Sequence, residues 1–418
     1  MPISKAPYIR YTEETSIPEY GDNGSEIPIY IAPTKVDVTG VGNTFSEVAV
    51  DKSHIYTVTS YKKAKKLFNS TELLEVLRQY FEENDNYYGD ELGSPYVYVI
   101  PLPLTPTAQN LSDALDLITI KRNCTAISIL GITDPVSIRT ELVGELNNEV
   151  EDGHLRIAYL KAPENTESAY KEAVRLAYIK DYTTKNQQDE DVVDTEGLTA
   201  FITANVKSYA DAIALICEKI NNPRIVLVEP EFYGVHLAKI CNTPYYLEPG
   251  YLPYYSVDVG EFEERSSDER DQLCMSGLVF GEDDYTLPTV VPRMCLGVST
   301  AFGKSDEDDY DTRTTDSLLH ARRNVDHHIR EILKIIAPQL KRNETSVILR
   351  YVQDEVMSYL DTELSKGTIM QYEFSVEESS YNPYCLLIRG KIVPVNSTLA
   401  IEFHNEIGAP YAIASDYV

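Results

Sequence analysis

The sequence predicts an α/β protein in several parts: a central α/β layer, a C-terminal module of two helices and a β-hairpin, and an extended arm at each end. In the middle of the chain, short apolar runs alternate with helical patterns of about 10–15 residues, which is typical of a substantially parallel sheet. The last hundred residues instead carry two long amphipathic helical patterns followed by strands. Four prolines within residues 1–30 exclude a helix there and predict an extended arm.

The α/β layer is predicted from strands and helices that follow one another along the chain. Six apolar runs have the length and composition of buried strands: Ile27–Ala32, Ile55–Ser60, Tyr96–Ile100, Ala126–Leu130, Leu155–Leu160 and Ile225–Glu229. The spacing of apolar residues predicts helices after Ser60 and over Leu73–Phe81, Leu111–Leu117, Val136–Glu149 and Tyr209–Ile220. Ser60, and Ser70 or Thr71, are suited to cap the first two of these helices.

The C-terminal module follows a different pattern. One long helix is predicted to end before Pro338 and a second at Gly367, because proline breaks a helix and glycine favours its C-terminal cap. The predicted helix starts are Asp316 or Ser317 and Thr345 or Ser346, and the strands that follow are Tyr372–Val376, Cys385–Val395 and Thr398–Phe403. The predicted parts are an arm at 1–20, an α/β region at 21–272 with a possible internal boundary near 95–105, a C-terminal domain at 273–405 and an arm at 406–418.

The charge of the chain restricts its partners. Its 418 residues include 66 Asp and Glu against 37 Lys and Arg, so the formal net charge is −29 at pH 7. This balance argues against nucleic acid and anionic lipid as main partners, because both require a basic surface. The sequence has neither an apolar run long enough to span a membrane nor a signal peptide, so we expect no direct membrane insertion. Six scattered cysteines favour buried thiols in a reducing compartment, with disulfides or a metal as the alternative.

Several stretches of the sequence are candidates for a functional site. The acidic stretches 187–197, 261–271 and 304–316 are predicted to be solvated loops; none has the ligand spacing of a calcium loop. The pair His327 and His328 is expected to face a partner or solvent, because neighbours on a helix point in different directions. The Tyr- and Pro-rich segment 244–255 is a packed irregular loop or, alternatively, a ligand platform. With no phosphate-binding, zinc or nucleophile motif, we predict no catalytic, cofactor-binding or metal residues.

Segments spread along the chain resemble the contractile tail sheath proteins of phages and related injection systems. The resembling segments are Pro7–Arg10, Thr57–Phe68, Leu73–Phe81 leading into Tyr96–Ile100, Leu273–Val279, Ala321–Ile329, Tyr351–Gly367 and Ile388–Ile401. Asn69 stands where that family usually has glycine, and 84–90 replaces its Asn-Gly-Gly turn. The order of these segments, rather than any single one, makes the resemblance specific.

The resemblance implies a structural subunit that polymerises helically around a tail tube and contracts to drive the tube through a host envelope. It implies a chain that is not an enzyme, needs no cofactor, and is located in a virion tail assembled in the host cytoplasm. The implied partners are further copies of the chain, the tail tube protein, and baseplate and tail terminator proteins. Two alternatives remain open: another self-assembling virion or tail protein with exchanged arms, and an acidic α/β enzyme with an unrecognised site.

Two sets of residues are the candidate contacts of such an assembly. The arms would add strands to the C-terminal hairpin of a neighbouring subunit through Ile3, Tyr8, Ile9, Tyr11, Leu399, Ile401 and Phe403. The helix Asp316–Ile336 would face the tail tube, because basic residues are scarce elsewhere but gather here. The predicted tube contacts are Arg322, Arg323, Asp326, Arg330 and Lys334. The alternative is that these basic residues form an ordinary solvated face of the helix.

Overall fold

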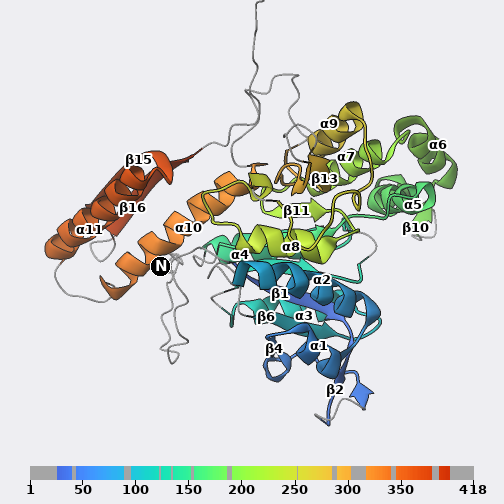
Figure 1. Ribbon diagram of the computed structural model, residues 1–418, viewed down its shortest axis with the longest axis horizontal. Coiled ribbons are helices and arrows are strands. Elements are labelled where there is room, and N and C mark those ends of the chain that lie inside the picture. Colours follow the sequence, from blue (N-terminus) through green and yellow to red (C-terminus); the bar gives the residue numbers. More distant parts are fainter. Residues whose placement is uncertain are drawn as a thin grey trace, which may run out of the picture.

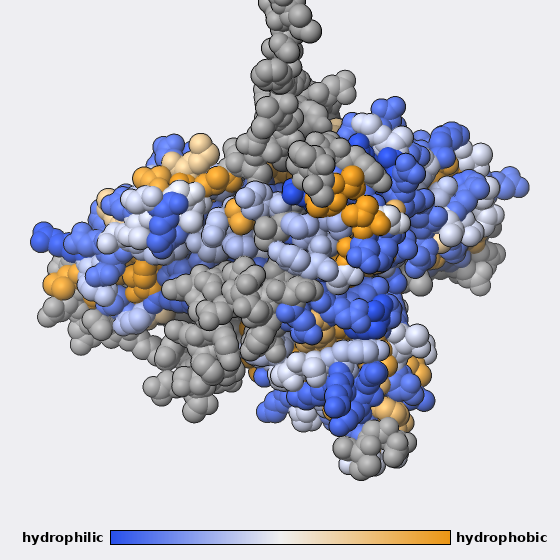
Figure 2. Space-filling model, viewed as in Figure 1, coloured by the Kyte–Doolittle hydropathy of each residue, from blue (hydrophilic) through white to orange (hydrophobic). Residues whose placement is uncertain are grey.

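The computed structural model describes residues 26–39, 44–88, 96–121, 124–132, 135–151, 155–185, 191–251, 253–284, 290–302, 317–339, 345–378 and 386–395. Figure 1 shows a large α/β part, with the C-terminal helices and hairpin at one end of the molecule. The exposed face in Figure 2 is mostly hydrophilic, and hydrophobic residues form small, separate patches on it. No helix of the described part is long and apolar enough to span a membrane.

A seven-stranded sheet forms the centre of the α/β part. Its strands are β1 (Ile27–Pro33), β4 (Tyr56–Val58), β6 (Val97–Leu102), β7 (Cys124–Ile129), β8 (Ile157–Lys161), β11 (Ile225–Val228) and β12 (Leu278–Val279). The strand order is β12-β11-β8-β7-β1-β6-β4. All neighbours are parallel except the edge strand β4, which runs antiparallel to β6. The predicted α/β layer with a substantially parallel sheet is therefore confirmed.

Helices cover both faces of this sheet. They are α1 (Tyr61–Leu67), α2 (Thr71–Tyr88), α3 (Ala108–Ile118), α4 (Arg139–Glu151), α5 (Glu167–Tyr178), α6 (Thr195–Asn205), α7 (Tyr209–Ile220), α8 (Tyr233–Asn242) and α9 (Ser267–Ser276). Alternate residues of β1 enter different cores: Ile29 and Ile31 pack with α3, α4, α5 and α7, whereas Tyr30 packs with α2 and α8. Gly234 allows α8 to approach α2 closely, because a Cβ there would lie 2.2 Å from the Val76 carbonyl oxygen.

Short strands and turns complete the α/β part. Two small sheets pair β2 (Lys35–Asp37) with β3 (Phe45–Ser46) and β5 (Phe68–Asn69), and β9 (Thr183–Lys185) with β10 (Asp191–Val193). A further hairpin pairs β13 (Gly281–Asp284) with β14 (Val291–Met294). The predicted boundary between residues 272 and 273 falls within the α/β layer, because β12 belongs to the main sheet. The predicted internal boundary near 95–105 falls on the inner strand β6. Neither position separates two folded units in the described chain.

Two of the three acidic stretches contain helix starts, where the sequence had predicted loops. The part of 261–271 from Ser267 onward is the first half of α9, and its capping box joins Ser266 to Glu269. In 187–197, the described residues include β10 and the start of α6, where the Asp194 side chain accepts a hydrogen bond from Gly197 N–H. Acidic side chains stabilise helix N-termini, so charge alone did not distinguish these segments from loops. The stretch 304–316 lies outside the described residues.

The C-terminal module consists of α10 (Leu319–Ile336), α11 (Thr345–Lys366) and a hairpin of β15 (Ile369–Glu378) and β16 (Leu386–Pro394). Its small core is formed by Val352, Val356, Leu360, Ile369 and Val376. As predicted, α11 ends at Gly367, which has a φ of +75°. The predicted two helices and hairpin are confirmed. The third predicted strand at 398–403 and both predicted arms, with all seven of their named residues, lie outside the described residues.

Candidate assembly surfaces

Helix α10 is joined to the α/β layer by buried charged side chains. Arg224, which immediately precedes β11, donates hydrogen bonds of 2.6 and 2.8 Å to the two carboxylate oxygens of Asp326. The two side chains are 10% and 2% exposed. A bidentate pair of this kind fixes both the distance and the relative orientation of the two side chains. It therefore sets the position of α10 on the sheet.

Two further contacts extend this connection along the first turns of α10. Arg323 lies 3.3 Å from a carboxylate oxygen of Glu26 and donates a 2.6 Å hydrogen bond to the Thr243 carbonyl. The His320 ring nitrogen Nδ1 lies 2.8 Å from a carboxylate oxygen of Glu248. We refer to Glu26, Arg224, Glu248, His320, Arg323 and Asp326 together as the α10 joint.

The α10 joint depends on pairing between its charges. Burial on its own would lower the pKa of Arg323, but the surrounding groups, of which the Glu26 carboxylate has the largest effect, together raise the pKa overall. The guanidinium therefore stays charged although it has no solvent exposure. Removing one partner from such a pair leaves an uncompensated buried charge, which is strongly destabilising.

The same helix also contacts the C-terminal module. The Asn324 side chain donates a 2.8 Å hydrogen bond to the Thr368 carbonyl, and His328 Nδ1 lies 2.7 Å from the Tyr359 hydroxyl. His327 stacks on Tyr245, with ring centroids 3.6 Å apart. Helix α10 is therefore held on one side by the sheet and on the other by α11 and the start of β15.

The two neighbouring histidines are kept neutral by their surroundings. Burial lowers the pKa of His327 to about 3, and the charge of Arg330 contributes. Burial also lowers the pKa of His328 to about 4, although the Glu363 carboxylate acts in the opposite direction. The expectation that this pair faces a partner or solvent is wrong for the described chain, because His327 packs on Tyr245 and His328 is fully buried.

The five predicted tube contacts do not form one exposed strip. Arg323 and Asp326 are buried within the α10 joint, and this part of the prediction is corrected because each is paired inside its own chain. Arg322 and Arg330 are half-buried, and Arg330 donates a 3.0 Å hydrogen bond to a backbone carbonyl just before β8. Lys334 is exposed and pairs with Glu331 at 2.7 Å. The tube contact itself stays a prediction.

A sequence signal for the buried polar face of α10 was present but incomplete. His320, Asn324 and His328 recur at intervals of four residues, so they share one face of α10, and that face is buried. The amphipathic pattern of the helix, in contrast, does not indicate that polar residues are buried. Because Glu26, Arg224 and Glu248 lie far away in the sequence, nothing local indicated that they would balance the charges of α10.

The hairpin β15–β16 presents two different faces. Tyr372, Phe374, Val376, Ile388 and Ile392 pack towards α11. Most of the alternate residues face outward and are polar or charged, although Leu387 on that face is apolar and exposed. Glu373 lies directly opposite Lys391 in the ladder. Within the described part of the chain, β15 and β16 pair only with each other. Each strand therefore has one edge whose backbone groups are unpaired in the described structure.

The Tyr- and Pro-rich segment 244–255 packs against α10 and α8 as an irregular loop, with one short helical turn at Pro249–Tyr251. The hydroxyl of Tyr245 donates to Glu363 at 3.2 Å, and the ring of Tyr254 is buried beside His236. The predicted packed loop is confirmed.

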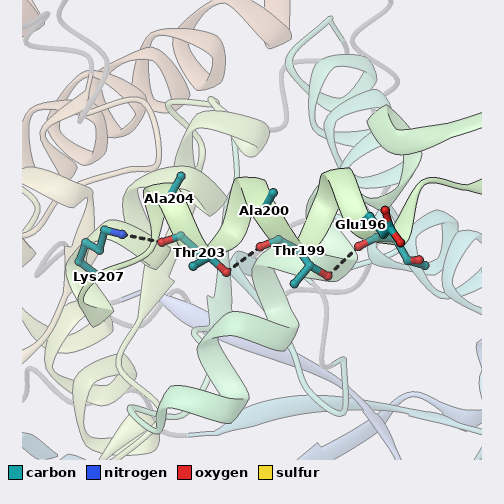
Figure 3. A pocket seen from close by; sticks show the side chains of 7 residues that line it. Glu196, Thr199, Ala200, Thr203, Ala204 and Lys207 are labelled. Atoms are coloured by element: carbon teal, nitrogen blue, oxygen red, sulfur yellow. Dashed lines mark hydrogen bonds between the residues drawn. The ribbon is translucent and has the colours of Figure 1, made fainter.

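The hollows found on the described part of the surface show no arrangement suited to catalysis. Figure 3 shows one of them, on the outer face of α6. The hydroxyl groups of Thr199 and Thr203 donate to helix carbonyls at 2.6 and 2.8 Å, and Lys207 bonds to the Thr203 carbonyl. These polar groups are already occupied, so they offer little to orient a substrate. Among the described residues, no three His, Cys, Asp or Glu side chains are grouped as a metal ion requires.

The whole fold resembles proteins of contractile injection systems. A chain in the cryo-EM structure of the anti-feeding prophage (AFP) baseplate matches with a TM-score of 0.58 and 14% identity, covering 97% of this chain and 100% of that one. The AFP helical sheath in its contracted state matches with a TM-score of 0.57 and 14% identity, covering 97% and 99% of the two chains. The PVC sheath complex of an extracellular contractile injection system, also contracted, has a TM-score of 0.57, 10% identity and the same coverage.

The likeness covers the α/β layer and the C-terminal module together. No protein-family model and no curated protein matches the sequence. The chain therefore has the fold seen in these sheath and baseplate structures, and the resemblance found in the sequence is confirmed for the fold.

Proposed function

We propose that this chain is a structural subunit of a contractile sheath, which polymerises helically around a tube and contracts to drive the tube through an envelope. The observation that carries the proposal is the likeness to two contracted sheath structures over 97% of the chain. A match of this extent includes the connection through α10, so it supports a shared architecture rather than one shared domain. The bonded polar groups of the α6 hollow favour this structural role over an enzyme.

In the proposed assembly, subunits are linked through the C-terminal hairpin. The predicted arm strands, around Tyr8 and Ile401, would add to the outer edges of β15 and β16 of neighbouring subunits. The unpaired edges within the described chain support this, because an added strand gains backbone hydrogen bonds with little sequence requirement. Contraction would then release energy as subunits exchange one set of contacts for a more extensive set, without a nucleotide or metal.

The proposed partners are further copies of the chain, a tube protein, a baseplate and a tail terminator, within a virion tail or a related particle assembled in the cytoplasm. The tube contact is proposed for Lys334 and for the exposed parts of Arg322 and Arg330, because Arg323 and Asp326 are committed to the α10 joint. Charge reversal at Lys334 should reduce sheathing of purified tubes at moderate salt and leave tube-free polymers intact, as scored by electron microscopy. Unchanged sheathing would place the tube contact elsewhere.

Deleting residues 1–15 tests the proposed function most directly. The truncated protein should keep the circular dichroism spectrum and melting temperature of the full chain, because the arm is proposed to pair with a neighbouring subunit and not with its own core. It should form no tubes or polysheath in negative-stain images, because the exchanged strand is missing. A matched control replaces residues 1–15 by Gly and Ser at the same length, which removes the strand pattern but keeps the length, and it should fail in the same way.

The outcomes separate the proposals. Tubes formed by the truncated protein would refute the role of the N-terminal arm while leaving the sheath assignment standing. A full-length chain that stays a compact monomer across salt and protein concentrations would refute the sheath assignment itself.

A further inference from the structure

Basic residues gather a second time in the chain, on the short helix α1. Four of its seven residues are lysines, and all four side chains are exposed. Ala64, which points the other way, is fully buried. Because successive residues of a helix are about 100° apart, the four lysines occupy less than half of its circumference and form one face. We refer to this set as the lysine face: Lys62, Lys63, Lys65 and Lys66.

The lysine face has no carboxylate partner in the described part of its own chain. Lys65 lies over the ring of Tyr61, with its Nζ 4.7 Å from the ring centroid. The nearest acidic residues along the chain, at the start of α2, are engaged elsewhere: Glu72 pairs with Lys161 at 3.4 Å, and Glu75 pairs with Arg78 at 2.6 Å.

The lysines are also poorly placed for the stability of α1 itself. Lys62 and Lys63 lie in its first turn, where no acidic residue is present and where positive charge opposes the helix dipole. The Ser60 side chain already caps this end by accepting from the Lys63 N–H. The fold of the single subunit therefore gives no reason for four neighbouring cations on a chain of net charge −29.

A surface of the opposite charge is formed by the loop before α9 and the first turns of that helix. Both arginines of this segment are engaged with carboxylates of neighbouring strands: Arg265 pairs with the buried Glu229, and Arg270 pairs with Glu282 at 3.0 Å. We refer to the exposed carboxylates of this segment as the α9 acidic surface: Asp258, Glu261, Glu263, Glu264, Asp268 and Asp271.

The two surfaces lie too far apart to meet within one subunit. Helix α1 contacts β4 and helix α9 contacts β12, and these strands are the two edges of the seven-stranded sheet. The six spacings between seven strands, at about 4.8 Å each, place these edges about 29 Å apart. Figure 1 shows α1 and α9 on opposite sides of the α/β part. The lysine face and the α9 acidic surface are therefore available to each other only between subunits.

We propose that the lysine face of one subunit docks on the α9 acidic surface of a second copy of this chain. Charge complementarity favours this occupant, because the chain itself carries the matching surface. Nucleic acid is less suited, because its binding rests on many phosphate contacts and the lysine face offers four cations on two helical turns. At about 0.1 M salt, the repulsion between two acidic subunits is screened beyond about 10 Å, whereas ion pairs in direct contact persist.

The proposed contact is head-to-tail, because it joins two different surfaces. Every associated pair keeps one free lysine face and one free α9 acidic surface, so further copies can add at both ends. A contact of this kind generates a ring or an open helical chain. It is separate from the proposed exchange of arms, and the inference does not rest on the proposed sheath function.

Neutralising the lysine face in the full chain tests the contact. The triple variant Lys62→Gln, Lys63→Gln and Lys66→Gln should raise the dissociation constant for self-association by about tenfold, because three ion pairs are lost. Sedimentation velocity at about 0.1 M salt measures the effect. The matched control Lys180→Gln, Lys185→Gln and Lys207→Gln removes three exposed positive charges elsewhere and should associate as the wild type does. Circular dichroism checks that all variants are folded.

Charge reversal identifies the complementary surface. One variant carries Lys62→Glu, Lys63→Glu and Lys66→Glu, and the other carries Glu264→Lys, Asp268→Lys and Asp271→Lys. Each should lose self-association on its own, because like charges then face each other in every contact. An equimolar mixture should associate again, because every contact between the two variants joins opposite charges.

Three results would overturn the inference. They are equal association of the lysine variant and its control, a mixture of the reversed variants that stays dissociated, and binding of an unrelated DNA duplex that depends on the lysine face. A wild type that associates through α1 and α9 but forms no tubes would instead count against the proposed sheath function, so the two failures are distinguishable.

Discussion

Replacing Asp326 with alanine is expected to lower the free energy of unfolding by about 3–5 kcal/mol. The change leaves the Arg224 guanidinium buried without the carboxylate that accepts two of its hydrogen bonds. It retains a 3.2 Å hydrogen bond to the Arg156 carbonyl, which cannot neutralise its charge. Urea unfolding followed by far-ultraviolet circular dichroism measures the effect, and suits a chain without tryptophan.

The control for this prediction lies on the same helix. Lys334→Ala removes a surface ion pair with Glu331, and we expect it to change stability by less than about 1 kcal/mol. The double variant Arg224→Met with Asp326→Leu removes both charges, so it should cost less than Asp326→Ala alone. If Asp326→Ala and Lys334→Ala have similar effects, the buried pair does not hold α10 in place.

Stability is expected to fall by about 4 kcal/mol between pH 7 and pH 5, with roughly equal contributions from His327 and His328. Both groups have pKa values in the folded chain, about 3 and about 4, that lie below the ordinary value of 6.5. The unfolded chain therefore binds more protons than the folded chain as the pH falls through 6.5. The stabilisation is complete above that pH and is progressively lost below it.

His328→Gln isolates half of this effect. Glutamine can still hydrogen bond to the Tyr359 hydroxyl, but it does not titrate, so the fall in stability between pH 7 and pH 5 should shrink by about 2 kcal/mol. The measurement is urea unfolding at several pH values for the wild type and the variant. Equal pH dependence of the two proteins would mean that His328 is not held neutral in the folded chain.

The sequence predicted those elements whose signals are local. The strands of the main sheet are apolar runs bounded by turns, and the end of α11 at Gly367 needs only a residue that tolerates a positive φ. Helix α8 was not predicted, because its N-cap residue is Phe232, whose side chain makes no capping hydrogen bond. Helix α9 was interpreted as an acidic loop, since its capping residues Ser266 and Glu269 are also common in loops.

The candidate site was predicted less well than the fold. A cluster of basic residues in α10 has the same local sequence whether its charges meet solvent, a tube or carboxylates of the same chain. The difference depends on Glu26 and Arg224, which lie far from α10 in the sequence and are brought next to it by the fold. Charges that are balanced over such long sequence distances are visible in the structure but have no local pattern.

The place of β1 in the sheet also determines the order in which the chain can fold as it is synthesised. Although β1 is the first strand in the described part of the chain, it lies between β6 and β7, and it is hydrogen-bonded to both. A growing chain therefore cannot complete the centre of its sheet until residue 129 has left the ribosome, and the edge strand β12 follows much later. Pairing between such distant segments is slow, so β1 stays incompletely paired during much of translation, when apolar strands are most open to wrong partners.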